Sequence, residues 1–242
     1  MEQNVKKRNI MIFNIVMALV IFVFDLIYLN IGKLVMKGIT SGLFFVLGLA
    51  NFIFGIKNKN TNFKFSLFLL LGLLFAMLGD IVLNINFVAG AVLFGIGHIL
   101  FFASYCWLNG LKWIDLVCGI VIFVPAMLFI VLSPLFSFEQ PLIEVVCIVY
   151  AFVISFMLGK SVSNLVREHT VTNLTIFVGS LLFFFSDLML LLNVFAGLGK
   201  AFDILCLITY YPAETLLAMS IWLSLTTNQK NKIQVNDDKK QS

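Results

Sequence analysis

Two aspartates stand in the middle of long apolar runs. Asp80 lies in the stretch FAMLGDIVLNINFVAG (75–90) and Asp187 in the stretch LFFFSDLMLLLNVFAG (182–197). In both stretches the aspartate is followed by Leu, Asn and Ala-Gly at the same distances. An ionised carboxylate at the centre of a membrane helix costs about 2.5–3.5 kcal/mol on insertion scales, and such residues are usually functional. We therefore interpret Asp80 and Asp187 as the candidate reactive pair.

Other polar side chains fall at a similar depth in neighbouring apolar segments. They are His98, Tyr150, Tyr210, Tyr211 and Glu214, with Asp25 and Lys37 nearer the segment ends. Polar and small residues recur at helical spacing, as in Gly72, Ala76 and Asp80. Side chains four apart share one face of a helix, and small residues let helices approach closely. We expect these faces to line one interior cavity, because polar groups facing lipid are costly.

Two carboxylates with one histidine and several tyrosines suit acid–base chemistry. When two carboxyl groups share a cavity of low dielectric constant, they do not both ionise readily, so one can be protonated while the other stays ionised. That arrangement serves hydrolysis through an oxocarbenium-like state.

The residues of several other chemistries are absent from the sequence. There are only 2 histidines, and the motifs H-E-x-x-H, G-x-S-x-G and C-x-x-C do not occur. The 4 cysteines all lie in apolar runs, where cysteine usually acts as a small buried apolar side chain. The sequence therefore predicts no metal site and no bound cofactor.

The elements that position these residues are membrane helices. Of the 242 residues, 61% are hydrophobic and 12% are charged, whereas soluble domains carry about a quarter charged residues. A membrane-spanning helix needs roughly 20 apolar residues. This length predicts an all-α bundle of eight spans. The spans are approximately 10–30, 34–56, 65–86, 90–109, 113–133, 141–160, 173–195 and 201–226.

The chain reads as one membrane domain (10–226) between an N-terminal tail (1–9) and a polar C-terminal tail (227–242) that we expect to be disordered. The net charge of +4 resides in loops and tails. It favours contact with membrane lipids and offers no domain for nucleic acid. Oligomeric state is left open.

Lys and Arg favour the cytoplasmic side of a membrane. If the N-terminus is cytoplasmic, all of the 16 Lys and Arg residues except Lys33, Lys37 and Lys200 also lie on that side. We therefore predict a multi-pass protein of the bacterial cell membrane with both termini in the cytoplasm. The segments with Asp80 and Asp187 then run in the same direction, which is consistent with two parallel four-helix halves. The other helices match poorly, so chance likeness between apolar segments is the alternative.

Four segments, in order, resemble the lysoplasmalogenase family of YhhN-like membrane proteins. They are LGDIVL (78–83), GIGHILFFASY (95–105), FFFSDLML (183–190) and YYPAETLLA (210–218). KLVMKGITSGL (33–43) resembles the family's Lys-Pro start, and Tyr150 its tyrosine in the sixth span. The chain departs at Gly38, where the family often has Pro, and at Glu214, where it often has Gln. The resemblance implies an eight-helix fold.

The resemblance also implies an activity, which is hydrolysis of the vinyl ether bond of lysoplasmenylcholine or lysoplasmenylethanolamine to a fatty aldehyde and a glycerophospho-base. This chemistry needs an acid, a base and no cofactor. Asp80 and Asp187 are then expected to be the acid–base pair, in either order, and His98 to orient, relay or supply the proton. Substrate-binding roles are expected for Lys37, which would hold the lipid phosphate, and for Tyr105, Tyr150, Tyr211 and Glu214.

Three other functions fit the same residues. A small-molecule or lipid transporter could use carboxylates at mid-membrane depth. A lipid-binding partner protein without catalysis would tolerate conservative changes of the aspartates. A metal-dependent amidase acting on lipids would lose its activity to a chelator.

Overall fold

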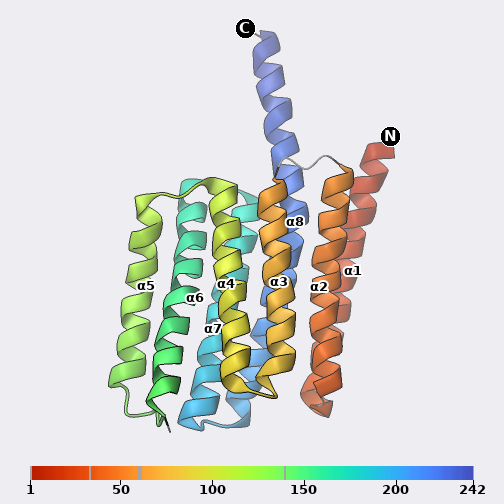
Figure 1. The fold of residues 1–242 in the computed structure, drawn as a ribbon. Helices are drawn as coiled ribbons and strands as arrows, with labels where there is room; N and C mark the ends of the chain where they lie inside the picture. The colour runs from red at the N-terminus through yellow and green to blue at the C-terminus, as the bar shows by residue number, and fades with distance from the viewer. Residues whose placement is uncertain (1, 33, 59–61, 139, 242) are drawn as a thin grey trace.

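The computed structural model is a bundle of long helices (Figure 1). The structure describes residues 2–32, 34–58, 62–138 and 140–241. The helices are α1 (Glu2–Ile31), α2 (Leu34–Lys57), α3 (Phe63–Leu83), α4 (Phe87–Asn109), α5 (Trp113–Leu132), α6 (Pro141–Arg167), α7 (Val171–Ala196) and α8 (Lys200–Gln241). Within the described residues, 8 helices are long and apolar enough to cross a membrane. The predicted all-α multi-pass membrane bundle is confirmed.

The predicted span boundaries differ from the helix ends at two places that matter. Helix α3 ends at Leu83 rather than at 86, because Asn84 to Asn86 form a tight connection in which Asn86 caps α4 by accepting a hydrogen bond from the Ala89 N–H at 2.9 Å. Asp80 therefore lies in the last turn of α3. At the C-terminus α8 continues to Gln241, beyond the predicted end of the last span at 226. Lys and Gln are good helix formers and extend a helix that is already nucleated.

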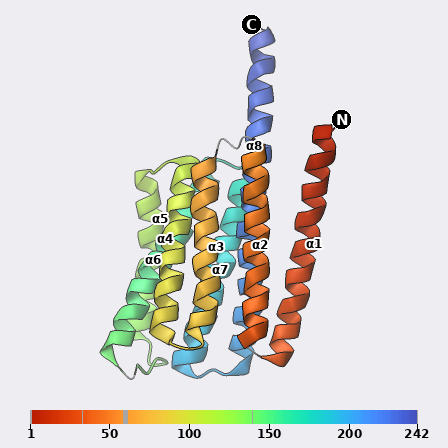
Figure 2. The same cartoon turned by 45° about the vertical axis from the view of Figure 1, so that its right-hand side comes forward.

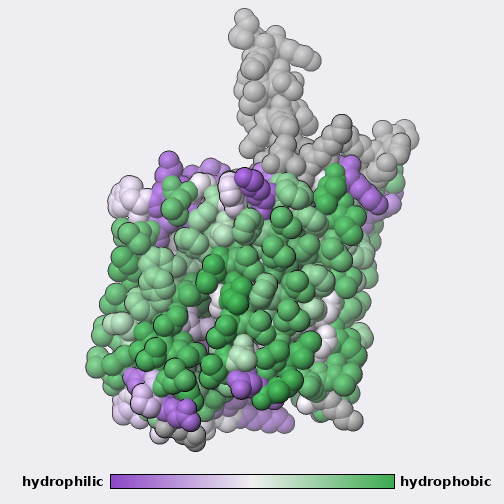
Figure 3. Space-filling view, in the orientation of Figure 1, coloured by the Kyte–Doolittle hydropathy of each residue, from purple (hydrophilic) through white to green (hydrophobic). Residues whose placement is uncertain are grey.

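Both chain ends lie at the same end of the bundle, which we call the terminal face (Figures 1 and 2). The α1–α2, α3–α4, α5–α6 and α7–α8 connections lie at the other end, the opposite face. Between the two ends the surface is a wide apolar belt (Figure 3). Of the charged residues used to predict the topology, Lys33 and Lys59 lie outside the described residues.

The helix contacts repeat between the two halves of the chain. Helix α1 packs on α2, α2 on α3 and α3 on α4, and the same pairs recur as α5 on α6, α6 on α7 and α7 on α8. The halves join in a matching way, because α8 contacts α2 as α4 contacts α6. This pattern is what two parallel four-helix halves would produce.

Two contacts break the repeat. Helix α8 packs closely on α1 and on α3, whereas among the described residues no Cα atoms of α4 and α5, or of α4 and α7, lie within 8 Å of each other. Side chains still join α4 to α7, as His98 does with Asp187. In the described part of the chain, the backbone of α5 comes this close to α6 alone, and α5 lies at one edge of the bundle (Figure 1). The helices of the second half therefore approach one another closely at fewer places than those of the first half.

Two glycines lie where helices approach each other closely. A Cβ on Gly90 of α4 would lie 2.4 Å from the Cα of Leu83 in α3. A Cβ on Gly159 of α6 would lie 2.5 Å from the backbone N of Gly119 in α5. Helices α5 and α6 are thus in close contact near the terminal face. Any wider separation between them must lie nearer the opposite face.

Candidate functional site

Asp80 is enclosed by donors from two other helices. Its Oδ2 accepts hydrogen bonds from Ser41 Oγ of α2 at 2.6 Å and from the Tyr210 hydroxyl of α8 at 2.7 Å. Lys37 Nζ, one turn before Ser41 on α2, lies 3.5 Å from Asp80 Oδ1. The Asp80 side chain is 3% exposed. The ammonium and the two hydroxyl donors together stabilise an ionised carboxylate in this apolar interior.

Asp187 of α7 has a second set of partners. The Tyr150 hydroxyl of α6 donates to its Oδ2 at 2.6 Å, and His98 Nε2 of α4 lies 3.3 Å from the same oxygen. His98 Nε2 is also 2.8 Å from the Tyr150 hydroxyl oxygen. The three groups form a compact triangle in which the Asp187 side chain is 15% exposed and that of His98 is fully buried.

The single hydroxyl hydrogen of Tyr150 fixes the direction of this chain. Since Tyr150 donates to Asp187, its oxygen accepts from His98, and the histidine proton resides on Nε2. His98 Nδ1 is buried and, within the described part of the chain, has no hydrogen-bond partner. The hydrogen bonds of His98 and Tyr150 therefore both point toward Asp187 and hold its carboxyl group in place.

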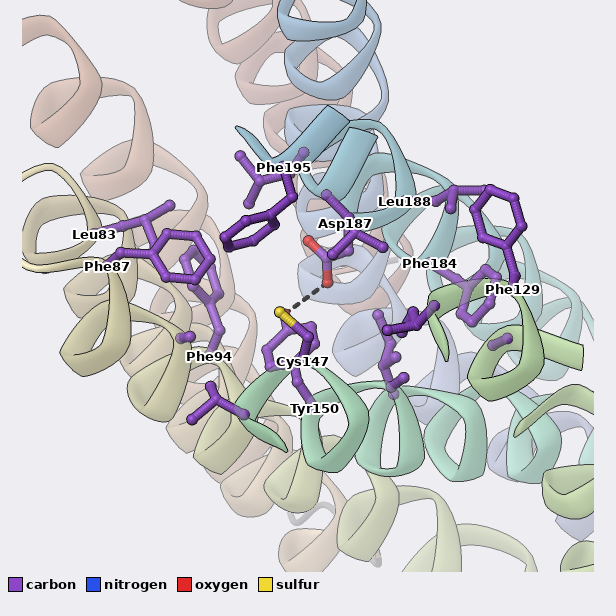
Figure 4. A pocket seen from close by; sticks show the side chains of 18 residues that line it. Leu83, Phe87, Phe94, Phe129, Cys147, Tyr150, Phe184, Asp187, Leu188 and Phe195 are labelled. Carbon is purple, nitrogen blue, oxygen red and sulfur yellow. Dashed lines mark hydrogen bonds between the residues drawn. The ribbon is translucent and has the colours of Figure 1, made fainter. Parts of the chain in front are cut away.

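A cavity of about 100 Å³ lies beside Asp187 and Tyr150, between α6 and α7 (Figure 4). At one end it is bounded by residues of α3 and α4, and at the other by residues of α5. Its walls are almost wholly apolar, and Asp187 is the one carboxylate that lines it. A hydrogen-bonded carboxylate that faces an apolar cavity is suited to transferring protons to and from an apolar substrate.

Aromatic rings separate the cavity from Asp80. Phe94, which lines the cavity, packs edge-on against Tyr210 with ring centroids 6.0 Å apart. Phe183 of α7 is fully buried and lies 4.6 Å from the His98 ring and 5.3 Å from the Tyr210 ring. The two carboxylates predicted as a pair therefore belong to two networks that meet through packed rings.

The structure brings only part of the predicted binding set to this cavity. Tyr150 lines it, whereas Lys37, Tyr105, Tyr211 and Glu214 do not. Tyr105 bonds Ser180 Oγ at 2.9 Å. Tyr211 lies 3.5 Å from Ser41 Oγ in the Asp80 network. Lys37 is engaged by Asp80.

Glu214 lies near both networks but joins neither. Its side chain is fully buried, and neither carboxyl oxygen has a hydrogen-bond partner among the described residues. It is within electrostatic reach of both Asp80 and Asp187. Asp25 of α1 is likewise buried, and no described residue makes a hydrogen bond to its carboxyl oxygens.

Sequence reasoning assigned no site role to three contributors to these networks. Ser41 follows Lys37 by four residues, so the spacing alone places it on the same helix face. Tyr210 shares a face with Glu214 in the same way, although the binding role was given to Tyr211. Phe183 stands in a run of phenylalanines (183–185), and no signal in such a run distinguishes the one ring that contacts His98.

A third polar cluster closes the terminal face and is structural in character. Lys160 Nζ of α6 lies 2.8 Å from Asp115 Oδ2, and Arg167 lies 3.5 Å from Asp115 Oδ1. The Asp115 carboxylate also accepts from the Lys112 N–H at 2.6 Å at the start of α5. These contacts fasten α5 to α6. Within the described chain, His, Cys, Asp and Glu side chains form no group of three that could hold a metal ion.

The sequence was compared with known proteins. A family model, described as the YhhN family, matches residues 32–221, which span α2 to most of α8. Searches among curated proteins and among solved structures found no match.

Proposed function

This chain belongs to the YhhN family, the lysoplasmalogenase family, and we propose from this premise that it hydrolyses the vinyl ether bond of alkenyl lysophospholipids. The observation that carries the proposal is the placement of Asp187, which is hydrogen-bonded to Tyr150 beside His98 and faces an apolar cavity between helices. A lipid substrate reaches such a cavity from the bilayer, and the reaction needs a positioned proton donor.

The chemistry assigns two successive duties to one carboxyl group. Protonated Asp187 delivers a proton to the β-carbon of the vinyl ether, and the C=C electrons form the new C–H bond. The oxocarbenium ion that results lies beside the Asp187 carboxylate, which stabilises its charge. Water then adds to the carbon bound to oxygen and gives its proton to Asp187. The hemiacetal then breaks its C–O bond while its hydroxyl proton passes to the leaving oxygen, which releases the aldehyde and the glycerophospho alcohol.

His98 and Tyr150 support the reaction through their contacts with Asp187. The hydrogen bonds from His98 Nε2–H to Tyr150 and from Tyr150 to Asp187 orient the carboxyl group for both steps. The surrounding phenylalanine rings exclude bulk water, which strengthens the attraction between carboxylate and cation.

Asp80 remains part of the proposal in a less direct role. Its carboxylate holds Tyr210, whose ring packs on Phe183, and Phe183 packs on His98. We assign Asp80 to positioning His98 through these rings, with Lys37 as its counter-ion. This differs from the acid–base pair expected from the sequence, in which both aspartates contact the substrate.

The test is direct. Purified protein in detergent is incubated with an alkenyl lysophospholipid, and aldehyde release is followed, with the saturated alkyl ether analogue as the substrate control. Aldehyde from the alkenyl lipid alone supports the proposal. Intact lipid after incubation with well-folded protein, with either head group, would exclude it. Movement of unmodified lipid or solute across liposomes would instead favour the transporter.

A further inference from the structure

The cavity continues past Asp187 and Tyr150 in two directions (Figure 4). We call one end the α4 arm, which is lined by Leu83, Phe87 and Phe94. The other end is the α5 arm. Its lining includes Ala126, Phe129, Ile130, Phe184 and Leu188. Asp187 and Tyr150 lie between the two arms, so a substrate bound beside them extends into both arms.

The cavity is too small to enclose a whole lysolipid. To hold one water molecule, a cavity needs about 10–15 Å³ of space that the centre of a water-sized sphere can reach. The cavity of about 100 Å³ therefore has room for the ether group and a short stretch of chain. A long hydrocarbon chain must emerge through the side of the bundle into the bilayer.

The α5 arm offers that exit. Among the described residues, α5 packs closely on α6, whereas no Cα atom of α5 lies within 8 Å of one in α7, although Phe129 of α5 and Leu188 of α7 both line the cavity there. Pinching at Gly119 and Gly159 holds the other end of the α5–α6 pair closed. Next to the arm, Leu128 is 44% exposed on the apolar belt. The side chains of α5 and α7 that line the arm at this point, such as Ala126, Phe129 and Leu188, are apolar.

The α4 arm ends in different surroundings. Leu83 and Phe87 flank the α3–α4 connection, where Asn84 and Asn86 are exposed at the opposite face. Polar groups at the end of a bundle meet the head-group region of a bilayer. The α5 arm is thus apolar, and the α4 arm ends near polar groups. A lysolipid likewise has an apolar hydrocarbon end and a polar head-group end.

We propose that the α5 arm binds the hydrocarbon chain of the lysolipid, which leaves the bundle between α5 and α7, while the glycerophospho end extends into the α4 arm. This assignment rests on the proposed function for the identity of the lipid. It adds the direction in which the lipid lies and the residues that select its chain.

Substitution within the α5 arm tests the direction. Ala126→Trp fills the arm, and we expect kcat/KM for a long-chain alkenyl lysolipid to fall by about tenfold or more, within the range for steric discrimination in apolar pockets, while a short-chain analogue is hydrolysed at the wild-type rate. Val121→Trp is the matched control, because Val121 is 65% exposed on the same helix. Equal losses for long and short chains, or no loss for either, would overturn the assignment.

Photocrosslinking tests the same assignment without catalysis. The probe is a saturated alkyl ether lysolipid with a diazirine in its chain, which binds but has no vinyl ether to hydrolyse. Label recovered on α5 and on residues 184–191 supports the α5 arm. Label on residues 83–94, or no label at all, overturns it. If the α5 arm is labelled but no alkenyl lipid is hydrolysed, the chain site stands and the proposed reaction fails.

Discussion

Asp80 and Asp187 are held in matching ways by the two halves of the bundle, yet Asp187 lines the cavity between α6 and α7 and Asp80 does not. Asp80 of α3 accepts from α2 and α8, and Asp187 of α7 is contacted by the corresponding helices, α6 and α4. The difference follows from packing. The backbone of α8 comes within 8 Å of α3 and of α1 beside Asp80, whereas in the described chain α4 and α7 meet through side chains alone, such as His98 and Phe183. The wider separation of these two helices leaves the space beside Asp187.

Replacing Asp187 with Asn should remove the proton-transfer step and leave the fold intact, since Asn keeps the shape of the side chain. We expect kcat for aldehyde release to fall by about 10²-fold or more, the usual contribution of a positioned acid or base. Asp203→Asn is the control, because Asp203 is an exposed carboxylate in the first turn of α8. Full activity of Asp187→Asn, with Asn shown by mass spectrometry not to have deamidated, would refute the assignment.

Tyr150→Phe keeps the ring but removes both hydrogen bonds that link His98 to Asp187. We expect kcat to fall, by less than for Asp187→Asn, with little change in KM, because the cavity walls remain. Tyr105→Phe also removes one buried hydroxyl, bonded to Ser180 outside the cavity, and should leave kcat unchanged. Steady-state kinetics of the two variants on one substrate make the comparison. Equal effects would mean that the hydroxyl groups matter only for folding.

The helices and the interior position of the aspartates could be predicted from the sequence, because span length and the cost of buried charge are properties of single segments. The partner of each aspartate could not. These segments are apolar on nearly every face, so periodicity does not fix how each helix is rotated. The rotation of α8 determines that Tyr210, and not Tyr211, contacts Asp80. The rotations of α4 and α7 place Phe94 and Phe183 between the two carboxylates.

Lys37 and Asp80 form a buried ion pair, so removing one charge should cost more than removing both. Lys37→Met leaves Asp80 without its counter-ion, and loss of one partner of a buried pair typically costs about 3–5 kcal/mol. The double variant Lys37→Met, Asp80→Asn should regain much of this stability. Unfolding of the wild type, both single variants and the double variant in detergent measures the coupling. Additive effects would show that the 3.5 Å approach contributes no interaction energy.

Glu214 and Asp115 are both buried carboxyl groups, but they should respond in opposite ways to amide replacement. Glu214 has no hydrogen-bond partner among the described residues, and an unpaired buried carboxyl is costly. Glu214→Gln should therefore keep or raise the melting temperature. Asp115→Asn weakens contacts with Lys160 and Arg167 and should lower it, since two cations lose their counter-charge. Melting temperatures of the two variants decide the question, because a clear loss in Glu214→Gln would require a partner for that carboxylate.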